Sequence, residues 1–320
     1  MQIPLPSNAI EFDALYRDEE SCIQTVVDAR WPDGFVCPRC GGTHCWEYDR
    51  RLLFECVACG YQVSPLAGTI FHGAKLALRK LFRLVYLLVA EKSGTNVCAL
   101  ARQVGVAYNT ALLWARKIRH AMVRPDRDKL AGTVEVDETI LGGPAEGHPG
   151  RSLGPNQALV LVLVEDDNGA CGRIRLEVVE SGGQEDLTPA IKENVEPGST
   201  VRTDGWAGYL DIGQAGYETV VKKLRGGLNA CEELPLVHLV ASLLKSFVNG
   251  LLHGRWTKTW LQQVLDEFVF RFNRRHSKYR PLLFNRVLES GVTRRSPTRD
   301  TLSAYGRVMV VPLPMTAGGL

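Results

Sequence analysis

The spacing of apolar and polar residues changes twice along the chain. In residues 9–30 and 75–122, apolar side chains recur every three or four positions, which predicts one or two short helices and then a longer helical region. From residue 133 onward, apolar residues alternate with polar ones or run together, which predicts strands. The helical spacing then returns at 237–252 and 257–276.

Five strands and one helix are expected in the strand-rich part. The first strand is "GTVEVDETILGG", and the next two form a hairpin because "ALVLVLVEDDNGACGRIRLEVVE" carries the turn residues Asp167-Asn168-Gly169. "DLTPAIKENV" follows as a helix, and "STVRTDGW" and "YETVVKK" follow as the last two strands. This order predicts an α/β fold around a mixed five-stranded sheet, with helices after it.

The polar stretch "RPDRDKLAG", residues 124–132, is the expected boundary between the two main parts. The glycine-rich residues 142–155 show neither a GxGxxG nor a GxxxxGK[ST] pattern, which favours a mobile loop over a nucleotide cradle. The predicted organisation is a helical segment at 1–34, a cysteine-rich segment at 35–70, a helical domain at 71–124, an α/β domain at 131–290 and a tail at 291–320.

Composition is that of an ordinary globular protein, with 45% hydrophobic and 23% charged residues. No run of 18 apolar residues and no secretory signal is found, so a cytoplasmic protein with reduced thiols and no membrane partner is expected. The net charge of +3 is uneven: residues 75–129 hold 12 Lys and Arg against 3 Asp and Glu, residues 133–244 hold 8 against 18, and residues 245–300 hold 12 against 4. Basic blocks around an acidic one fit a polyanionic partner and a cation site, and solvated surface charge is the alternative.

Two pairs of cysteines predict a zinc site. "CPRC" and "CVAC" form a C-x2-C-x15-C-x2-C arrangement of Cys37, Cys40, Cys56 and Cys59. Four thiolates suit a closed tetrahedral Zn²⁺ site, which is structural because it leaves no open position for a substrate. His44 and Cys45 break the symmetric spacing and are left out. Core packing is the expected role of Cys22, Cys98, Cys171 and Cys231.

A helix-turn-helix is expected in "VCALARQVGVAYNTALLWARKIRHAM", with a tight turn at Gly105. Such a motif lays its second helix in the major groove of DNA, and a plain helical hairpin is the alternative. The positive charge of this region favours DNA. Base edges are the expected contacts of Tyr108, Asn109 and Thr110, and phosphates those of Arg116 and Lys117.

Two aspartates stand at places where strands would present them together. Alternation puts Asp137 and Glu135 on the face of the first strand opposite Val134 and Val136, and Asp204 ends "STVRTD". Two close carboxylates repel each other, and a divalent cation relieves that repulsion. Oxygen ligands favour Mg²⁺ or Mn²⁺, and two such ions clamp a phosphodiester for displacement. Each aspartate by itself is also a common turn former.

Four segments together resemble the signatures of bacterial insertion-sequence transposases of the DDE class: "VEVDETILGG", "RTDGWAGY", "VHLVASLLK" and "LDEFVFRFNRR". With "WPDGFVCPRCGG" and "GTIFH" they resemble the ISXO-type branch, which has an N-terminal zinc ribbon and a helix-turn-helix. The resemblance implies a ribonuclease H-like catalytic core, metal-dependent cleavage at element ends and transfer of 3′-hydroxyls into target DNA. Asp137 and Asp204 match the first two catalytic acids.

The third catalytic acid has no carboxylate counterpart in "VHLVASLLK". In relatives with a glutamate, it precedes a lysine by seven residues, and counting back from Lys245 gives His238. Another alignment gives Leu243, which cannot bind a metal and predicts a silent site. We favour His238. Its neutral imidazole adds no negative charge, so the site is expected to bind Mg²⁺ more weakly than a three-carboxylate site and to work better with Mn²⁺. The alternative is that His238 only begins the helix and binds no metal. Glu232 and Glu233 are the next candidates for the third ligand.

The resemblance implies that Lys245 contacts phosphate near the scissile bond. In "FVFRFNRRHSKYR" most aromatics are expected in the core, and the DNA backbone is the expected contact of Arg271, Arg274 and Arg275. Asp266 and Glu267 are alternative, structural partners for Arg271 and Arg275.

The sequence thus predicts a transposase that binds element ends and catalyses metal-dependent cleavage and strand transfer. Its expected partners are double-stranded DNA and further copies of itself, since pairing two ends requires a dimer or larger assembly. Its expected localisation is cytoplasmic, in a bacterium and associated with the nucleoid. A catalytically silent DNA-binding protein is the main alternative, and a nuclease without strand transfer is a weaker one.

Overall fold

The computed structural model describes residues 5–48, 52–124, 126–142, 153–154, 157–222, 233–252, 256–277, 279, 281–294, 297 and 302. Most of the loop expected at 142–155 lies outside these residues, as do Cys231 and Glu232. The described chain divides into two compact units, one formed by residues up to 124 and from 277 onward, the other by residues 126–276.

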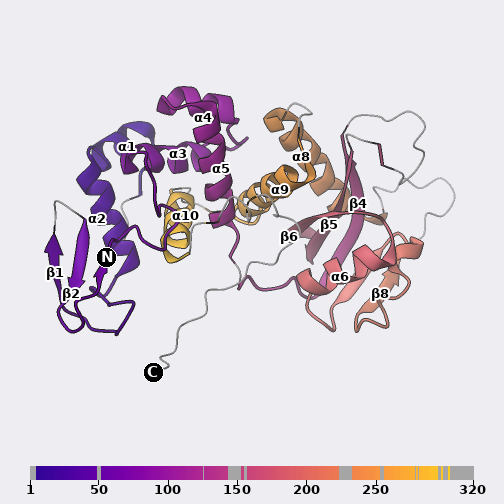
Figure 1. The fold of residues 1–320 in the computed structure, drawn as a ribbon. Coiled ribbons are helices and arrows are strands. Elements are labelled where there is room, and N and C mark those ends of the chain that lie inside the picture. The colour runs from indigo at the N-terminus through magenta and orange to yellow at the C-terminus, as the bar shows by residue number, and fades with distance from the viewer. Residues whose placement is uncertain are drawn as a thin grey trace. The chain divides into compact units, whose positions relative to one another are not determined.

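The first unit is built from helices and a small sheet (Figure 1). Asn8 and Asp18 start its first two helices by accepting the backbone N–H groups of Glu11 and Ser21, as N-cap side chains do. The helices are α1 (Ala9–Leu15), α2 (Glu19–Arg30), α3 (Leu78–Ala90), α4 (Val97–Val104), α5 (Tyr108–Met122) and α10 (Leu282–Thr293).

Helix α10 belongs to the first unit, although the sequence boundaries assign residues up to 290 to the α/β domain. The reason is an aromatic cluster that α10 completes. Phe284 of α10 lies 6.1 Å from Phe12 and 6.0 Å from Phe82, measured between ring centres. Phe284 is 1% exposed, so its burial holds α10 against α1 and α3.

The cysteine-rich segment forms an antiparallel sheet in the order β1-β2-β3. Its strands are β1 (Cys45–Tyr48), β2 (Leu53–Cys56) and β3 (Gln62–Val63). Strands this short bury little apolar surface, so the sheet needs a further source of stability.

A mixed five-stranded sheet forms the second unit, as the sequence predicts. Its order is β6-β5-β4-β7-β8, with β4, β7 and β8 parallel and β5 and β6 antiparallel to their neighbours. The hairpin turn falls at Asn168 and Gly169, whose φ angles of 55° and 85° match the turn that these residues favour. The strands are β4 (Thr133–Leu141), β5 (Ala158–Asp167), β6 (Ala170–Val179), β7 (Thr200–Thr203) and β8 (Glu218–Val221).

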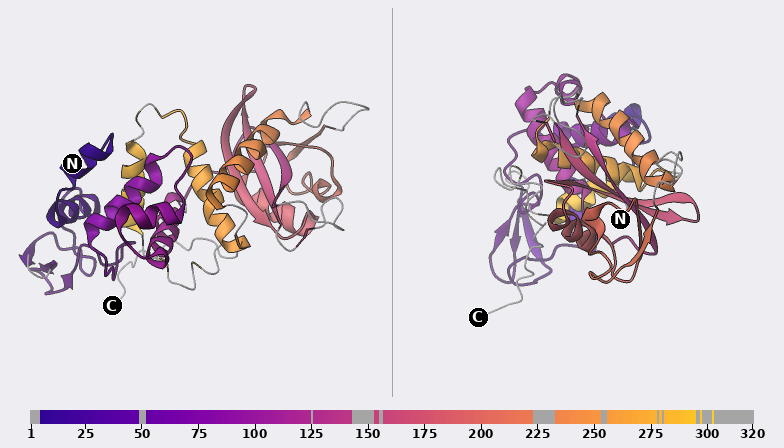
Figure 2. Two further views of the ribbon diagram at one scale, coloured as in Figure 1. Left: turned by 90° about the horizontal axis from the view of Figure 1, so that it is seen from above. Right: turned by 90° about the vertical axis from the view of Figure 1, so that its right-hand side faces the viewer.

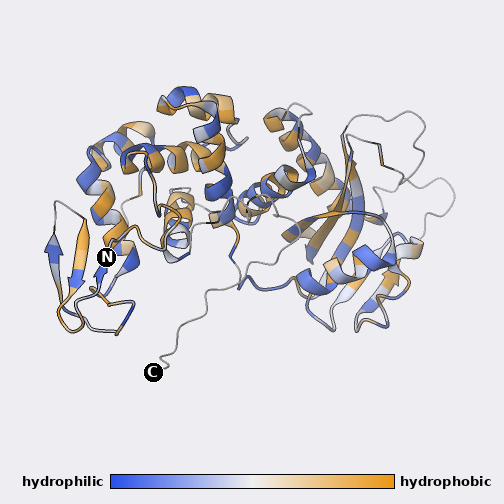
Figure 3. Cartoon of the chain, viewed as in Figure 1, coloured by the Kyte–Doolittle hydropathy of each residue, from blue (hydrophilic) through white to orange (hydrophobic). Residues whose placement is uncertain are grey.

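Helices cover both faces of this sheet. The helices α8 (Pro235–Leu252) and α9 (Lys258–Phe272) pack on one face, and α6 (Gln184–Asn194) packs on the other (Figures 1 and 2). Strand β5 carries mainly hydrophobic colour in Figure 3, as a strand covered on both faces does. On β4, Val134 and Val136 join the α6 side, so Glu135 and Asp137 turn toward α8.

Within the described residues, α8 is the one helix long and apolar enough to cross a membrane by those two properties alone. Six of its side chains are instead packed in the core of the second unit, and another side carries polar residues into a pocket. This is how a core helix of a domain is built.

Candidate functional site

Four residues predicted to act together line one pocket of the second unit. The pocket has a volume of about 720 Å³. Asp137 enters it from β4, Asp204 from the residue after β7, and His238 and Lys245 from α8. Further polar side chains complete the lining: Glu138, Thr139, Ser242, Ser246 and Asn249.

The pairing of β4 with β7 explains why the two aspartates meet. The strands are parallel, and their register pairs Glu135 with Arg202. The recorded pairing ends there, and the same register continued for two residues leads to Asp137 on β4 and to Asp204, which directly follows β7. Because paired strands lie about 4.8 Å apart, strand pairing by itself brings both carboxylates to one edge of the sheet.

Each aspartate is oriented by a backbone N–H group close to it in sequence. Oδ1 of Asp137 accepts the N–H of Glu138 at 2.8 Å, and Oδ1 of Asp204 accepts the N–H of Trp206 at 2.9 Å. The indole N–H of Trp206 in turn donates to the carbonyl of Gly182 at 2.8 Å. The loop after β7 is therefore tied down beside the pocket.

Negative charge is concentrated around Tyr209. Burial raises the pKa of Tyr209 well above its ordinary value, and the carboxylates of Glu138, Asp137 and Asp204 raise it further. Glu138 is absent from the predicted site because alternation along β4 assigns it to the face opposite Asp137. The two adjacent acidic residues in "VDET" were the feature of the sequence that could have indicated a role for Glu138 in the site.

Helix α8 turns His238 toward the aspartates. Nε2 of His238 lies 4.0 Å from Oδ2 of Asp137. The helix faces the pocket at 238, 241–242, 245–246 and 249, which is the period of an α-helix. Leu243, given by the other alignment, is 45% exposed and does not line the pocket, and neither does Glu233. The seven-residue spacing therefore places both His238 and Lys245 in the pocket, and the role of His238 as a metal ligand stays a prediction.

The donors in this pocket fit a hard divalent cation. Carboxylate oxygens suit Mg²⁺ and Mn²⁺, and an imidazole nitrogen suits Mn²⁺ better than Mg²⁺. The ligand atoms of Asp137, Asp204 and His238 do not all lie within 4.8 Å of one another; among the described residues, a set of cysteines is the one group that does.

That set is the predicted zinc site of the ribbon. The sulfurs of Cys37 and Cys59 are 3.7 Å apart and those of Cys40 and Cys56 are 3.6 Å apart. A disulfide requires about 2.05 Å, so these are separate thiols. Zn–S bonds of about 2.3 Å give a tetrahedron with edges of about 3.8 Å, which matches the observed spacing.

Local backbone donors favour the thiolate form of Cys37. Burial raises the pKa of Cys37, but N–H groups of Arg39 and Cys40 outweigh it, and the pKa falls to about 7. At Cys40 the N–H group of Gly42 acts in the same direction, but the neighbouring thiols of Cys59 and Cys56 outweigh it and raise the pKa of Cys40 to about 12. Thiolates are the form that binds zinc.

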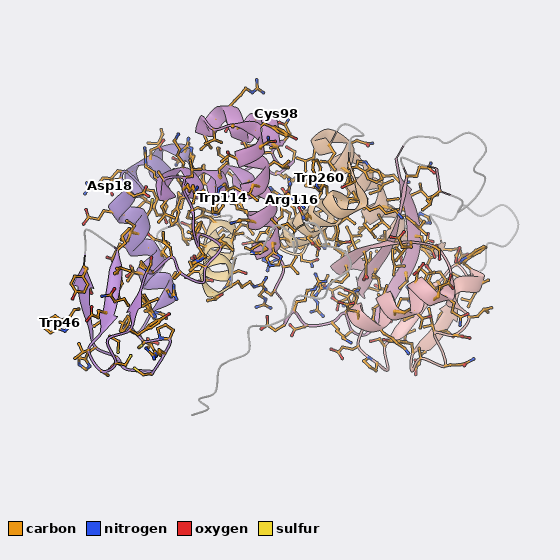
Figure 4. The ribbon with its side chains drawn as sticks, viewed as in Figure 1. Asp18, Trp46, Cys98, Trp114, Arg116 and Trp260 are labelled. Carbon is orange, nitrogen blue, oxygen red and sulfur yellow. The ribbon has the colours of Figure 1, made fainter. Side chains whose placement is uncertain are left out.

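The remaining cysteines have different surroundings. Cys45 pairs with Cys56 across β1 and β2 but does not belong to the zinc set. Cys22 is buried and Cys171 is partly buried, as core packing requires. The prediction for Cys98 is wrong, because it lies on the exposed side of α4 (Figure 4).

Comparisons with known proteins agree with this geometry. The model of the ISXO2-like transposase domain matches residues 129–273, and that of the transposase zinc-ribbon domain matches residues 17–62. Residues 129–273 are therefore similar to an ISXO2-like transposase domain, and residues 17–62 to a transposase zinc ribbon. A protein of Halobacterium salinarum, described as an uncharacterized protein in transposable element ISH50, is 25% identical over 206 residues, which cover 60% of this chain and 69% of the relative.

The transposase domain coincides with the second unit of the fold. Its matched residues contain all five strands of the mixed sheet together with α6, α8 and α9. The expected ribonuclease H-like architecture agrees with this sheet, and four close cysteines in a transposase zinc ribbon support structural zinc. The helices α3, α4, α5 and α10 lie outside both matched ranges.

Two of these helices, α4 and α5, follow each other across a tight turn, as the predicted helix-turn-helix requires. Gly105 ends α4 with a φ of 66°, a conformation that favours glycine, and α5 begins at Tyr108. Tyr108 and Asn109 are exposed and Thr110 is half-buried, so the first turn of α5 is accessible.

The structure turns two other predicted DNA contacts inward. Arg116 donates to the carbonyl of Leu302, and Nζ of Lys117 lies 4.7 Å from the ring centre of Trp114 (Figure 4). Both side chains are half-buried, and burial lowers the pKa of each. They serve the packing of the first unit, which the charge pattern of α5 does not reveal.

Arg271 is also an internal residue, contrary to its predicted contact with DNA. Its Nη2 lies 2.7 Å from Oε1 of Glu267, and the side chains are 8% and 0% exposed. The alternative of a structural ion pair is therefore supported for Arg271.

The two arginines that follow lie against aromatic rings. Arg274 is 4.2 Å from the ring centre of Phe270, and Arg275 is 4.1 Å from that of Phe272. Arg275 is exposed and also donates to the carbonyl of Gly172 at 3.2 Å. Of the three, Arg275 is the exposed one, and its contact with the DNA backbone stays a prediction.

Replacing Glu267 with alanine is expected to destabilise the second unit by about 3 kcal/mol, since it leaves the buried Arg271 without this partner. The unfolding midpoint of that unit should fall by about 6–12 °C in a thermal scan. The double replacement Glu267→Leu with Arg271→Met removes both charges and should recover most of the loss. An unchanged midpoint in Glu267→Ala would contradict a structural role for the pair.

Proposed function

We propose that this chain is an active transposase, which binds insertion-sequence ends and catalyses divalent-metal-dependent DNA cleavage and strand transfer. The observation that carries the proposal is the meeting of Asp137, Asp204, His238 and Lys245 in one pocket of an ISXO2-like transposase domain.

Each residue has a role that follows from its chemistry. Divalent cations, when bound, would neutralise phosphate charge and activate the attacking hydroxyl. Asp137 and Asp204 supply the charged oxygen ligands for them, and His238 supplies a neutral nitrogen beside Asp137. Two carboxylates in place of three leave the site less negative, so we expect a preference for Mn²⁺ over Mg²⁺.

Lys245 would hold the DNA strand against this site. It stands two helical turns beyond His238 on the same side of α8, about 10 Å along the helix axis. The Lys245 side chain is exposed, so its ammonium group can pair with a phosphate next to the scissile one.

End recognition is assigned to the first unit. The accessible first turn of α5 carries Tyr108, Asn109 and Thr110, and residues 75–129 hold an excess of nine positive charges, 12 against 3. Both features fit major-groove reading with phosphate attraction. Joining two ends requires two such units, so we expect a dimer or larger assembly on DNA, working in the cytoplasm at the nucleoid.

A silent, DNA-binding derivative is the second candidate. Its supporting observation is that α8 brings no carboxylate into the pocket, so the acidic lining comes from Asp137, Glu138 and Asp204. This candidate differs from the first in predicting DNA binding without cleavage.

Strand transfer of a labelled element-end duplex in Mg²⁺ and in Mn²⁺ tests the proposal. His238→Ala should slow cleavage about 100-fold, as the loss of a metal ligand or its support does. Leu243→Ala, on the same helix but outside the pocket, should keep the wild-type rate and is the matched control. Wild-type protein that binds ends and cuts with neither metal would establish the silent candidate. A rate loss in Leu243→Ala alone would reject the assignment of His238.

A further inference from the structure

Glu135 is a buried carboxylate that the proposed chemistry does not use. It is 1% exposed and lies on β4, two residues before Asp137. Its Oε2 accepts the backbone N–H of Leu236 at 2.9 Å and that of Val237 at 3.2 Å, at the start of α8. A side chain of the sheet therefore caps the helix, where a helix more often carries its own cap.

The other oxygen of Glu135 reaches β7. Its Oε1 lies 3.5 Å from Nη1 of Arg202, and the same nitrogen lies 3.1 Å from Oδ2 of Asp166 on β5. Arg202 is thus held between two carboxylates, one on each of two strands. A buried carboxylate needs such partners, and Glu135 has two backbone N–H groups of α8 and the guanidinium of Arg202.

Each end of the network is next to a residue of the proposed site. Glu135 precedes Asp137 by two residues, and Arg202 precedes Asp204 by two. Leu236 precedes His238 by two, and its N–H group is one of those that Glu135 accepts. The register that pairs Glu135 with Arg202 is also the one that sets the aspartates side by side.

Stabilising β4 and its immediate neighbours does not by itself explain the contacts of Glu135, as a comparison with Glu165 shows. Glu165, on β5, accepts the N–H groups of Ala131 and Arg173 and pairs with the Arg173 side chain at 2.6 Å. It makes the same kinds of contact as Glu135, but these partners, Ala131 and Arg173, lie outside α8 and β7. The two carboxylates therefore differ in which elements they join and not in how they are satisfied.

We propose that Glu135 is a positioning residue, which with Arg202 locks β4, β7 and α8 so that Asp137, Asp204 and His238 line one pocket, from which rotation of their side chains brings them to a divalent cation. The inference rests on the proposed function, since it concerns the same pocket. It adds that the carboxylate of Glu135 sets the position of α8 on the sheet, although α8 is distant in sequence from both aspartates.

Four variants test the lock. Glu135→Leu removes the cap and the ion pair, and Glu135→Gln keeps an oxygen for the helix N–H groups but loses the charge. Arg202→Met breaks the link to β7, and Glu165→Gln is the matched control. Mn²⁺ binding without DNA, measured by electron paramagnetic resonance, reports on the pocket independently of catalysis, with Asp137→Asn to identify the signal of this site. Hydrogen exchange of residues 235–240 reports on the seat of α8.

The Mn²⁺ dissociation constant should rise about tenfold in Glu135→Gln and Arg202→Met, and further in Glu135→Leu, with faster exchange at Leu236 and Val237. End cleavage at a fixed, subsaturating Mn²⁺ concentration should fall about 100-fold. Glu165→Gln should lower the unfolding midpoint but keep the Mn²⁺ affinity, since it breaks a similar pair elsewhere. A positioning residue changes the Mn²⁺ affinity, whereas a residue that only stabilises the fold changes the unfolding midpoint alone.

Equal Mn²⁺ affinity in wild type and in all Glu135 and Arg202 variants would overturn the inference, as would wild-type protein that binds no Mn²⁺ in this pocket. If Glu135→Leu does not fold, Glu135→Gln and Arg202→Met still decide it. Wild-type protein that binds Mn²⁺ and DNA but never cuts would reject the proposed function, while the affinities of the variants would still support or overturn the lock.

Discussion

Asp137→Asn is expected to slow DNA-end cleavage at least a thousandfold, roughly 4 kcal/mol of transition-state stabilisation, with end binding unchanged. Asparagine has the same shape and can still accept the N–H group of Glu138, so the fold of β4 is retained. What it lacks is the negative charge that would balance a divalent cation beside Asp204. Single-turnover cleavage of a labelled end, with binding followed by mobility shift, measures the two effects separately.

Asp167→Asn is the control for this prediction. Asp167 is an exposed carboxylate in the hairpin turn between β5 and β6, in the same sheet but outside the pocket. It should cleave at the wild-type rate. Cleavage by Asp137→Asn at a rate close to that of Asp167→Asn would remove Asp137 from the chemistry.

Loss of a zinc ligand is expected to unfold the ribbon. The strands of the ribbon have four, four and two residues, so its apolar core is small and metal binding must supply much of its stability. Apparent binding energies of structural zinc in small domains are about 10–16 kcal/mol, far more than a few short strands provide. Cys59→Ser should therefore abolish hydrogen-exchange protection in the ribbon strands, and zinc chelation should do the same to the wild type.

Cys45→Ser is the matched control within the ribbon. Cys45 stands opposite Cys56 across β1 and β2, yet its sulfur does not belong to the zinc set. The variant should keep both its zinc content, measured by mass spectrometry, and its protected strands. Loss of zinc from Cys45→Ser, or a folded ribbon in Cys59→Ser, would contradict the four-cysteine site.

The secondary structure of this protein was largely predictable because it depends on local patterns. The alternation in β4, the turn residues Asn168 and Gly169, and the apolar faces of α4 and α5 are each contained in a short stretch. The zinc ligands were predictable for the same reason, since the spacing within each C-x2-C pair is set by a single tight turn.

The roles of the arginines were not predictable from local patterns. Three arginines in similar basic segments have different surroundings. Arg116 donates to the carbonyl of Leu302, and Arg271 is buried in an ion pair with Glu267. Arg275 is exposed. A long cationic side chain reaches either DNA or an internal partner, and the choice depends on which other segment packs beside it.

By itself, the sequence determined the nature of this protein's parts: a four-cysteine ribbon, a helix-turn-helix, a mixed sheet and two aspartates at strand ends. It left open which residue of α8 meets those aspartates. Only the tertiary structure placed His238, and not Leu243, in one pocket with those aspartates, because the face that a helix presents depends on how its start is held. Here Glu135, about a hundred residues earlier, holds that start, and a contact over that sequence distance leaves no trace in a local pattern.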